Sequence, residues 1–216
     1  PTPLGTNENP RIRALVDKHL SENELPLSGT VASTIFPSSL WNPELPRQQL
    51  YERYDRIWPR LRKIKANRNG TYFQRFMAFE GPDEPINQLE HLFTTYMEKG
   101  NHRRSALQLA VFNPRTDHVH SRQRGFPCLH QVSITPTANE TLAITGYYAT
   151  QTLFEKAYGN YLGLIRLGEF IAKEMGMTLS QSTCIASVAK LSNGGAFATR
   201  KQRICDELTK IIGLTF

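Results

Sequence analysis

The stretch that decides the fold is TLFEKAYGNYLGLIRLGEFIAKEM, residues 152–175, together with the runs that flank it. Its apolar residues recur at steps of three and four, the period of a helix with one buried face: Leu153, Ala157, Tyr161, Leu164, Leu167 and Ile171. Runs rich in β-branched and aromatic residues lie on either side, at residues 141–148 and 182–191. Such runs are typical of strands. The pattern therefore predicts a central buried helix between two strands.

The rest of the chain mixes both kinds of element. Helical periodicity also covers residues 11–20, 47–65, 86–98 and 200–212, and strand-like runs also cover residues 30–36, 72–79, 106–112 and 128–135. Because helices and strands alternate without a steady strand-helix-strand repeat, we expect an α+β fold with helices covering one face of a mixed sheet. A chain of 216 residues fits a single domain.

The charge of the chain points to an anionic partner without choosing one. A formal net charge of +7 and a pI near 9.5 suit nucleic acid, an acidic membrane surface or a phosphorylated small molecule. The basic residues are scattered in short groups and form no polybasic tail. No run of eighteen apolar residues occurs, and residues 1–10 are polar where a signal peptide needs an apolar run. We expect a soluble, cytoplasmic protein without a membrane partner.

The cysteines and histidines suggest no metal or disulfide site. Cys128, Cys184 and Cys205 are an odd number at wide spacing, which fits neither a disulfide framework nor a CxxC metal site, so we expect reduced thiols. Cys184 and Cys205 fall in an apolar strand and an amphipathic helix, where a structural role is expected. Histidines 118, 120 and 130 lack a fourth ligand at zinc spacing, so we expect no metal.

Two features could carry chemistry. Cys128 stands between a basic loop and a strand, where nearby cations would lower the pKa of the thiol and suit it to nucleophilic catalysis. The alternative is a small apolar filler at the start of a strand. Arg103 and Arg104 are adjacent at a helix-to-strand turn, where guanidinium groups could bind phosphate or could simply be solvated.

The block of residues 86–134 joins these features into one pattern. INQLEHLFTTYMEKGNHRRSALQLAVFNP, a loop, and GFPCLHQVSI resemble the thymidylate synthase and deoxycytidylate hydroxymethylase family in order and spacing. The matching elements are Asn87-Gln88-Leu89, Arg103-Arg104, Phe112-Asn113-Pro114 and Pro127-Cys128.

The resemblance extends over residues 70–191. The run Tyr147-Tyr148-Ala149-Thr150, followed by Phe154 and Asn160, is similar to the Tyr-Gln-Arg-Ser and Pro-Phe-Asn elements of the family. Upstream, Tyr72-Phe73-Gln74-Arg75 resembles a Tyr-Gly-x-Gln-Trp-Arg strand. The resemblance implies one thymidylate synthase-like domain over residues 1–216.

The resemblance implies a one-carbon transferase that methylates or hydroxymethylates a pyrimidine nucleotide. Cys128 would add to C6 of the ring, and C5 would take its one-carbon unit from methylenetetrahydrofolate. Asn160 would pair with the pyrimidine edge, because an amide both donates and accepts hydrogen bonds. In a homodimer, Arg103 and Arg104 would reach the phosphate of the neighbouring subunit. Tyr72, Thr150 and His130 are the other expected substrate-binding residues.

The chain departs from the family around the substrate. Ala149-Thr150 replaces the phosphate-binding Arg-Ser, Thr152 stands at an acidic position, and residues 187–191 lack the His and Tyr that hold the sugar. Leu129 follows the cysteine, which displaces His130. The chain ends at Phe216, before the C-terminal lid of the family. We therefore expect an altered substrate. The alternative is a non-catalytic nucleotide-binding or dimeric scaffold protein of the same fold.

One aromatic and basic stretch allows a nucleic-acid interpretation. Tyr51, Tyr54 and Trp58 interleave with arginines that could contact phosphates while the rings stack on bases: Arg53, Arg56, Arg60 and Arg62. The same three- and four-residue spacing is that of a packed helix stripe. We expect the packed stripe and no nucleic-acid partner.

Overall fold

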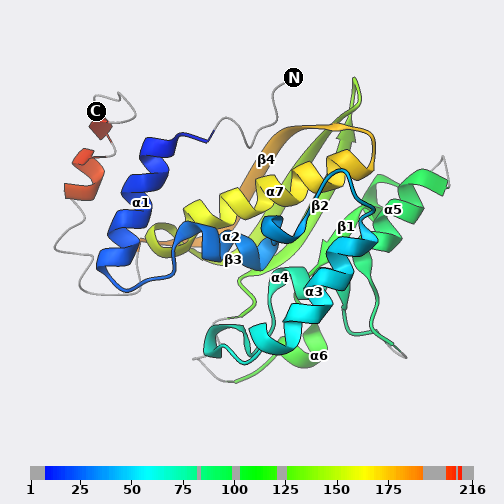
Figure 1. Ribbon diagram of the computed structural model, residues 1–216, viewed down its shortest axis with the longest axis horizontal. Coiled ribbons are helices and arrows are strands. Elements are labelled where there is room, and N and C mark those ends of the chain that lie inside the picture. Colours follow the sequence, from blue (N-terminus) through cyan, green and yellow to red (C-terminus); the bar gives the residue numbers. More distant parts are fainter. Residues whose placement is uncertain are drawn as a thin grey trace.

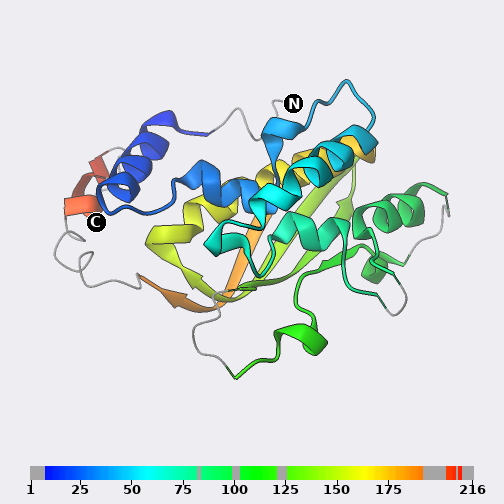
Figure 2. The ribbon, with the colours of Figure 1, turned by 60° about the horizontal axis from the view of Figure 1, so that its bottom comes forward.

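Four strands form one sheet in the order β1 (Gln108–Ala110), β2 (Leu129–Thr137), β3 (Thr141–Thr152) and β4 (Thr178–Lys190). The computed structural model describes residues 8–81, 84–98, 103–120, 126–191, 203–207 and 209–210. The pairs β1–β2 and β2–β3 are antiparallel, and β3–β4 is parallel, so the sheet is mixed. Helices lie against one side of it (Figures 1 and 2). The predicted α+β fold, one domain with a mixed sheet packed against helices, is confirmed.

The connection between the two parallel strands contains the helix predicted from residues 152–175. A π-helical turn, η5 (Leu153–Ala157), leads into α7 (Tyr158–Glu174). Leu164, Leu167 and Ile171 are fully buried in the core, whereas Leu153 and Tyr161 of the predicted stripe are 40% exposed. The helix is thus central and buried, but it starts six residues later than its periodicity suggested, because β3 continues to Thr152.

The predicted strand at residues 30–36 is wrong, because this segment is α2 (Ser28–Ile35). Its buried apolar residues, Val31, Ala32 and Ile35, have helical spacing, and α2 packs against α7. The contact is close: a Cβ on Gly159 would lie 2.5 Å from Cβ of Val31. A Cβ on Gly163 would lie 2.9 Å from Cβ of Ile35. Tertiary packing on α7 therefore overrides the strand propensity of the β-branched residues.

The predicted strand at residues 72–79 is also wrong, because residues Tyr72–Met77 form α4. Thr71 caps this helix by accepting a hydrogen bond from the backbone N–H of Gln74. Phe73, Phe76 and Met77 are buried on one helical face. The segment that resembles a Tyr-Gly-x-Gln-Trp-Arg strand therefore reaches the core as a helix.

Other helices complete the described part of the chain: α1 (Pro10–Glu22), η2 (Ser38–Leu40), α3 (Gln48–Leu61), η3 (Lys65–Asn67), α5 (Gln88–Glu98), η4 (Arg104–Ala106) and α6 (Pro114–Asp117). In α3, Tyr51 and Tyr54 are buried, and Trp58 stacks on Tyr54 with ring centroids 6.0 Å apart. The expected packed stripe is present: Tyr51 and Tyr54 belong to the core, and Trp58 is partly buried against it. The expected strand at residues 106–112 is present over a shorter span, as β1.

The predicted helix at residues 200–212 falls partly outside the described residues, but residues 203–207 and 209–210 are helical. This segment lies beside α1 (Figure 1). The carboxylate oxygen Oε2 of Glu207 is 3.4 Å from Nε2 of the buried His19 on α1. Ile204 is buried and Cys205 is exposed, so Ile204 and not Cys205 packs from this segment into the protein. None of the described helices has the length and apolar character needed to cross a bilayer.

Candidate functional site

A cavity of about 740 Å³ lies where the sheet, α2, α4 and α7 meet residues 64–71. Residues from separate parts of the chain line it: α2, residues 64–71 with the start of α4, the segment before β2, the end of β3 with the turn that follows it, and the first turn of α7. The volume lies within the range of small-molecule sites in proteins, roughly 300–1,000 Å³. Four of the residues predicted from the sequence line this cavity: Tyr72, Cys128, Thr150 and Asn160.

Cys128 is held at the start of β2. Its carbonyl oxygen accepts a hydrogen bond of 2.9 Å from the backbone N–H of Ala149 on β3. The residue is half-buried, packs partly against the core and lines the cavity. None of the three cysteines is in a disulfide, as predicted. Cys184 is half-buried in β4, where burial raises the pKa of its thiol to about 12.

The thiol of Cys128 differs from the sequence-based expectation. Burial raises its pKa, and the positive charges of Lys156 and Lys190 offset part of this rise. The expectation was a pKa lowered by the loop before β2, of which residues 121–125 lie outside the described part of the chain. The described cations that act on the thiol come instead from the turn before α7 and from the end of β4.

Asn160 lies in the first turn of α7 and is only 5% exposed. Its side-chain amide makes no hydrogen bond to another described residue, although it lines the cavity. The close contact of Gly159 with α2 fixes this turn against the cavity. The arrangement presents one donor and one acceptor to a ligand.

Tyr72 and Thr150 border the same space. The ring of Tyr72 packs on Phe126 with centroids 5.2 Å apart. Burial raises the pKa of Tyr72 well above its ordinary value, and the nearby Cys128 raises it further. The phenol is therefore a neutral hydrogen-bonding group. Thr150 and Thr152, at the end of β3, add hydroxyl groups to the lining.

Arg103, Arg104 and His130 do not line this cavity. The two arginines are exposed at the start of η4 and make no ion pair with a described residue. His130 lies on β2 and stacks on Phe112 with ring centroids 4.7 Å apart. Its backbone carbonyl also accepts hydrogen bonds from Val111 and Phe112. Within one subunit, His130 thus supports the Phe112-Asn113-Pro114 turn.

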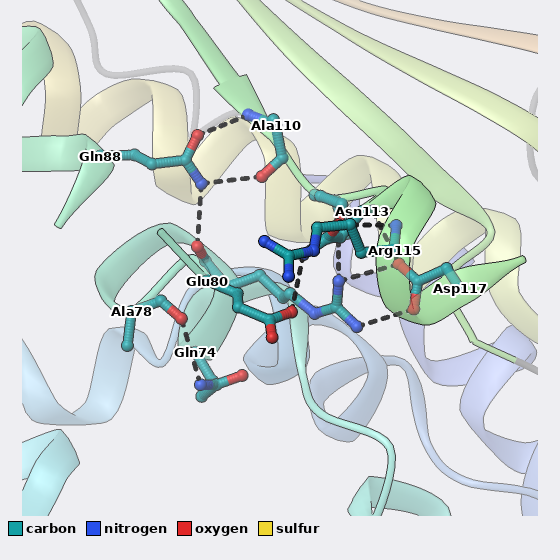
Figure 3. Close-up of polar contacts among 10 residues, drawn as sticks. Gln74, Ala78, Glu80, Gln88, Ala110, Asn113, Arg115 and Asp117 are labelled. Carbon is teal, nitrogen blue, oxygen red and sulfur yellow. Dashed lines mark hydrogen bonds and ion pairs between the residues drawn. The ribbon is translucent and has the colours of Figure 1, made fainter. Parts of the chain in front are cut away.

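A buried ion pair lies next to the cavity. Arg75 donates to both carboxylate oxygens of Asp117, which is labelled in Figure 3, at 2.8 and 2.9 Å, and to the carbonyl oxygen of Val111 at 2.9 Å. Its guanidinium group also lies 5.2 Å from the ring centre of Phe126, which lines the cavity. Arg75 was recognised in the sequence only as part of a motif, and its positioning role was missed because Asp117 lies in a segment read as a loop.

Gln88, from the Asn87-Gln88-Leu89 motif, also has a structural role. Its side chain donates to the carbonyl oxygens of Arg75 and Ala110, at 2.9 and 2.8 Å, and accepts from the N–H of Ala110 at 2.7 Å. Figure 3 shows this amide beside the edge strand β1. It therefore satisfies backbone groups of β1 and joins α4, α5 and the sheet.

Sequence analysis missed the charge of the cavity. Lys65, Arg68 and Lys156 line it, together with the amides of Asn67, Asn69 and Gln151, whereas its described lining contains no Asp, Glu or His. Lys65 and Arg68 make no ion pair with a described residue. A signal is present in the sequence, because the loop-forming residues Asn67 to Gly70 lie between the basic end of a predicted helix, residues 47–65, and Tyr72. Nothing in that pattern says which way its cations face.

No family model matches the chain. The chain is 33% identical over 108 residues to a protein of Methanocaldococcus jannaschii named "Putative thymidylate synthase", a match that covers 49% of this chain and 47% of that protein. The chain thus spans about half the length of this relative. The match supports a distant thymidylate synthase-like relationship. The sequence resemblance of residues 70–191 suggests the same family. In the described residues, no group of three or more His, Cys, Asp and Glu side chains could hold a metal.

Proposed function

We propose that the protein is a divergent thymidylate synthase-like transferase. In this proposal Cys128 activates C5 of a pyrimidine nucleotide, or of a related heterocycle, for transfer of a methyl or hydroxymethyl group. The observation that carries the proposal is that Cys128 and Asn160, from distant parts of the sequence, line one cavity. The name of the M. jannaschii relative supports the same class of reaction.

The cavity offers the groups that such chemistry needs. A thiolate of Cys128 would add to C6, and the electron pair of the C5–C6 double bond would make C5 a nucleophile. The amide of Asn160 would hold the base by one donated and one accepted hydrogen bond. Its place in the cavity lining supports this role, because a ligand edge can pair with it there.

The lining favours an anionic ligand. The described lining residues include the cations Lys65, Arg68 and Lys156 and no carboxylate. The positive charge of the lining would therefore attract a negatively charged ligand. A nucleotide phosphate meets this need, and the hydroxyl group of Thr150 can donate to it. Within one subunit, Lys65 and Arg68 would replace the arginine that the family has at the position of Ala149.

The cavity also suits a second ring. Phe126, Ile64 and Val31 give it apolar surface beyond the polar groups near Cys128, so the residues present fit the flat pterin of methylenetetrahydrofolate. When bound, this cofactor would supply the one-carbon unit. The protein's own part would be to bind and orient the ring, with Phe126 fixed by Arg75 and Tyr72.

We further propose a homodimer in which Arg103 and Arg104 contribute to the phosphate site of the neighbouring subunit. Their exposure and lack of ion pairs within the described residues leave them available for this contact. Tyr147 and Ile185, which are neighbours on β3 and β4, are 39% and 48% exposed and would give a second copy an apolar surface. Sedimentation of wild-type protein tests the dimer, and Arg103→Ala/Arg104→Ala tests the shared site.

The decisive experiment is a screen of uridine and cytidine nucleotides for exchange of the C5 hydrogen with solvent. Exchange reports addition of the thiol to C6 even when the carbon donor is unknown. We expect exchange with wild-type protein and none with Cys128→Ala, at unchanged circular dichroism. Exchange that persists in Cys128→Ala would remove the proposal. Nucleotide binding by calorimetry with no exchange by wild-type protein would instead favour the non-catalytic nucleotide-binding alternative.

A further inference from the structure

Among the described residues, the lining of the cavity lacks the side chains that most often move protons in enzymes. The ionisable groups of this described lining are Lys65, Arg68, Tyr72, Cys128 and Lys156, with no Asp, Glu or His. Arginine does not lose its proton in proteins, and Tyr72 is held neutral by burial. Besides the nucleophile, the two lysines are the described lining groups that can act as general acid and base.

Of the two lysines, Lys156 is the one beside the nucleophile. It lies in the π-helical turn η5 between the end of β3, which carries Thr150 and Thr152, and the first turn of α7, which carries Asn160. π-helical turns are rare and occur frequently at functional sites. Here the turn places a lysine in the lining of the same cavity as Cys128, close enough for its charge to act on the thiol.

We propose that Lys156 is the proton carrier of this site, taking the proton of the Cys128 thiol and exchanging protons with C5 of the substrate. This inference rests on the proposed function, because it assigns a second catalytic residue to the same reaction. It concerns a residue of this chain outside the motifs that carry the resemblance.

The electrostatic surroundings of the pair support this assignment. Lys156 is exposed as a whole residue, but desolvation by the surrounding protein lowers the pKa of its amine, while the negative charges of Glu155 and Cys128 act in the opposite direction. Burial raises the pKa of Cys128, against the effect of Lys156 and Lys190. The two pKa values therefore move toward one another, which favours proton transfer between the groups. Tyr72 and Tyr148 also face Cys128, and burial raises the pKa of both, so both remain neutral.

The route balances without another reagent. The neutral amine of Lys156 removes the thiol proton, and the sulfur electron pair forms a bond to C6 while the C5–C6 π electrons move toward C5. The ammonium group then gives its proton to C5, which leaves a saturated adduct. In reverse, the amine removes one of the two C5 protons, the C5–C6 double bond forms again, and the C6–S bond breaks with its electrons returning to sulfur. The net result is exchange of the C5 hydrogen.

The first test needs no substrate. The rate of alkylation of Cys128 by iodoacetamide is measured against pH, in a Cys184→Ser/Cys205→Ser background. Because Lys156→Met removes a cation that lowers the pKa of the thiol, its profile should move to higher pH, with a loss of rate of about threefold to tenfold below the pKa. Lys156→Arg should keep the profile of the background protein. Lys173→Met, exposed near the end of α7, is the matched control and should also keep it.

The second test separates a proton carrier from a fixed charge. In the C5 exchange assay, Lys156→Arg should lose exchange despite its retained charge, because its guanidinium cannot give up a proton. Lys156→Ala should also lose exchange and should regain part of it when ethylamine is added. Exchange at the wild-type rate in Lys156→Arg would overturn the inference, as would an unchanged alkylation profile in Lys156→Met. If wild-type protein shows no exchange, the proposed function and the proton route are both overturned. If Cys128→Ala loses exchange but the Lys156 variants keep it, the proposed function stands and only the role of Lys156 as proton carrier is overturned.

Discussion

The two walls of the cavity are built in different ways. The wall formed by β2, β3 and α7 carries Cys128, Thr150 and Asn160 on elements that are fixed by the core. The opposite wall, residues 64–70, is a short 3-10 turn and loop whose Lys65 and Arg68 are exposed. Groups that react or read a base need fixed positions, whereas a cation can act on a phosphate from a mobile side chain. The difference suggests that chemistry belongs to the first wall and charge recognition to the second.

The largest effect should come from the ion pair of Arg75 and Asp117, which packs against the lining residue Phe126. Arg75→Met takes from the carboxylate of Asp117, whose side chain is 0% exposed, the guanidinium group that donates to both of its oxygens. Breaking a buried pair in this way typically costs about 3–5 kcal/mol. We expect a loss of this size in the free energy of unfolding measured with urea.

The control for Arg75→Met is the double variant Arg75→Met/Asp117→Asn. It removes both charges of the pair and should regain part of the lost free energy, because the buried negative charge that Arg75 balances is removed as well. If Arg75→Met unfolded at the same urea concentration as wild type, the ion pair would not stabilise the protein. The contact of Phe126 with Tyr72, and not its contact with Arg75, would then be the one that holds Phe126 in place.

A smaller effect should follow from disturbing the first wall at Gly159. In Gly159→Ala the new Cβ would lie 2.5 Å from Cβ of Val31 and 2.8 Å from the carbonyl oxygen of Ser28, so α2 must move away from α7. Overpacking of this kind typically costs about 1–3 kcal/mol. Because Asn160 is the next residue, nucleotide affinity should fall as well, which calorimetry would show.

Gly29→Ala is the matched control for this substitution. A Cβ there would meet only the end of the Arg13 side chain, at 2.9 Å, and that group can move. Alanine is also the better helix former, by up to about 1 kcal/mol. Gly29→Ala should therefore leave stability unchanged or slightly increased. Equal losses in both variants would mean that the close contact between α2 and α7 is not what positions Asn160.

Sequence reasoning found the elements that pack by simple periodicity and failed where tertiary contacts decide. The strands β2, β3 and β4 and the helix α7 follow from their patterns. The segments at Val31 and Phe73 do not, because their β-branched and aromatic residues suit a strand by composition, while a cap at Thr71 and packing on α7 select a helix. Local propensity is a weak guide when such contacts outweigh it.

The candidate site shows the same limit. Motif order brought together Cys128, Asn160, Tyr72 and Thr150, because a resemblance carries spatial information that periodicity lacks. Lys156, Lys65 and Arg68 were missed, since a scattered lysine or arginine is most often solvated and only the fold shows which ones face a cavity. Cys128 was expected to have a low pKa from a neighbouring loop, whereas its burial is a property of the folded core.

The second wall should affect ligand charge and little else. Lys65→Ala and Arg68→Ala should each weaken binding of a nucleoside monophosphate by about tenfold, the low end expected for a charged contact at an exposed position. Affinity for the matching nucleoside should not change, because it has no phosphate. Calorimetry with both ligands would measure this, with the exposed Arg56→Ala on α3 as control. A similar loss for the nucleoside would assign these residues to the base or sugar instead.

The smallest effect concerns the attachment of α1 to the first wall through α2. Asp17 accepts a hydrogen bond of 2.8 Å from the N–H of Ser28, at the start of α2, and pairs with Arg13 at 2.7 Å. Burial alone would raise the pKa of Asp17, but the hydrogen bonds from Ser28 and Arg13 lower it below its ordinary value.

A carboxylate whose pKa is lower in the folded protein than in the unfolded chain stabilises the folded protein at any pH above the pKa of the unfolded chain. This stabilisation disappears as the pH falls through the pKa of the folded protein. The free energy of unfolding of wild type should therefore fall below about pH 4 more steeply than that of Asp17→Asn, by less than about 1 kcal/mol because the pair is partly exposed. If the free energy of unfolding falls equally with pH in wild type and in Asp17→Asn below about pH 4, the charge of Asp17 does not stabilise the contact between α1 and α2. The attachment of α1 would then depend on its apolar contacts.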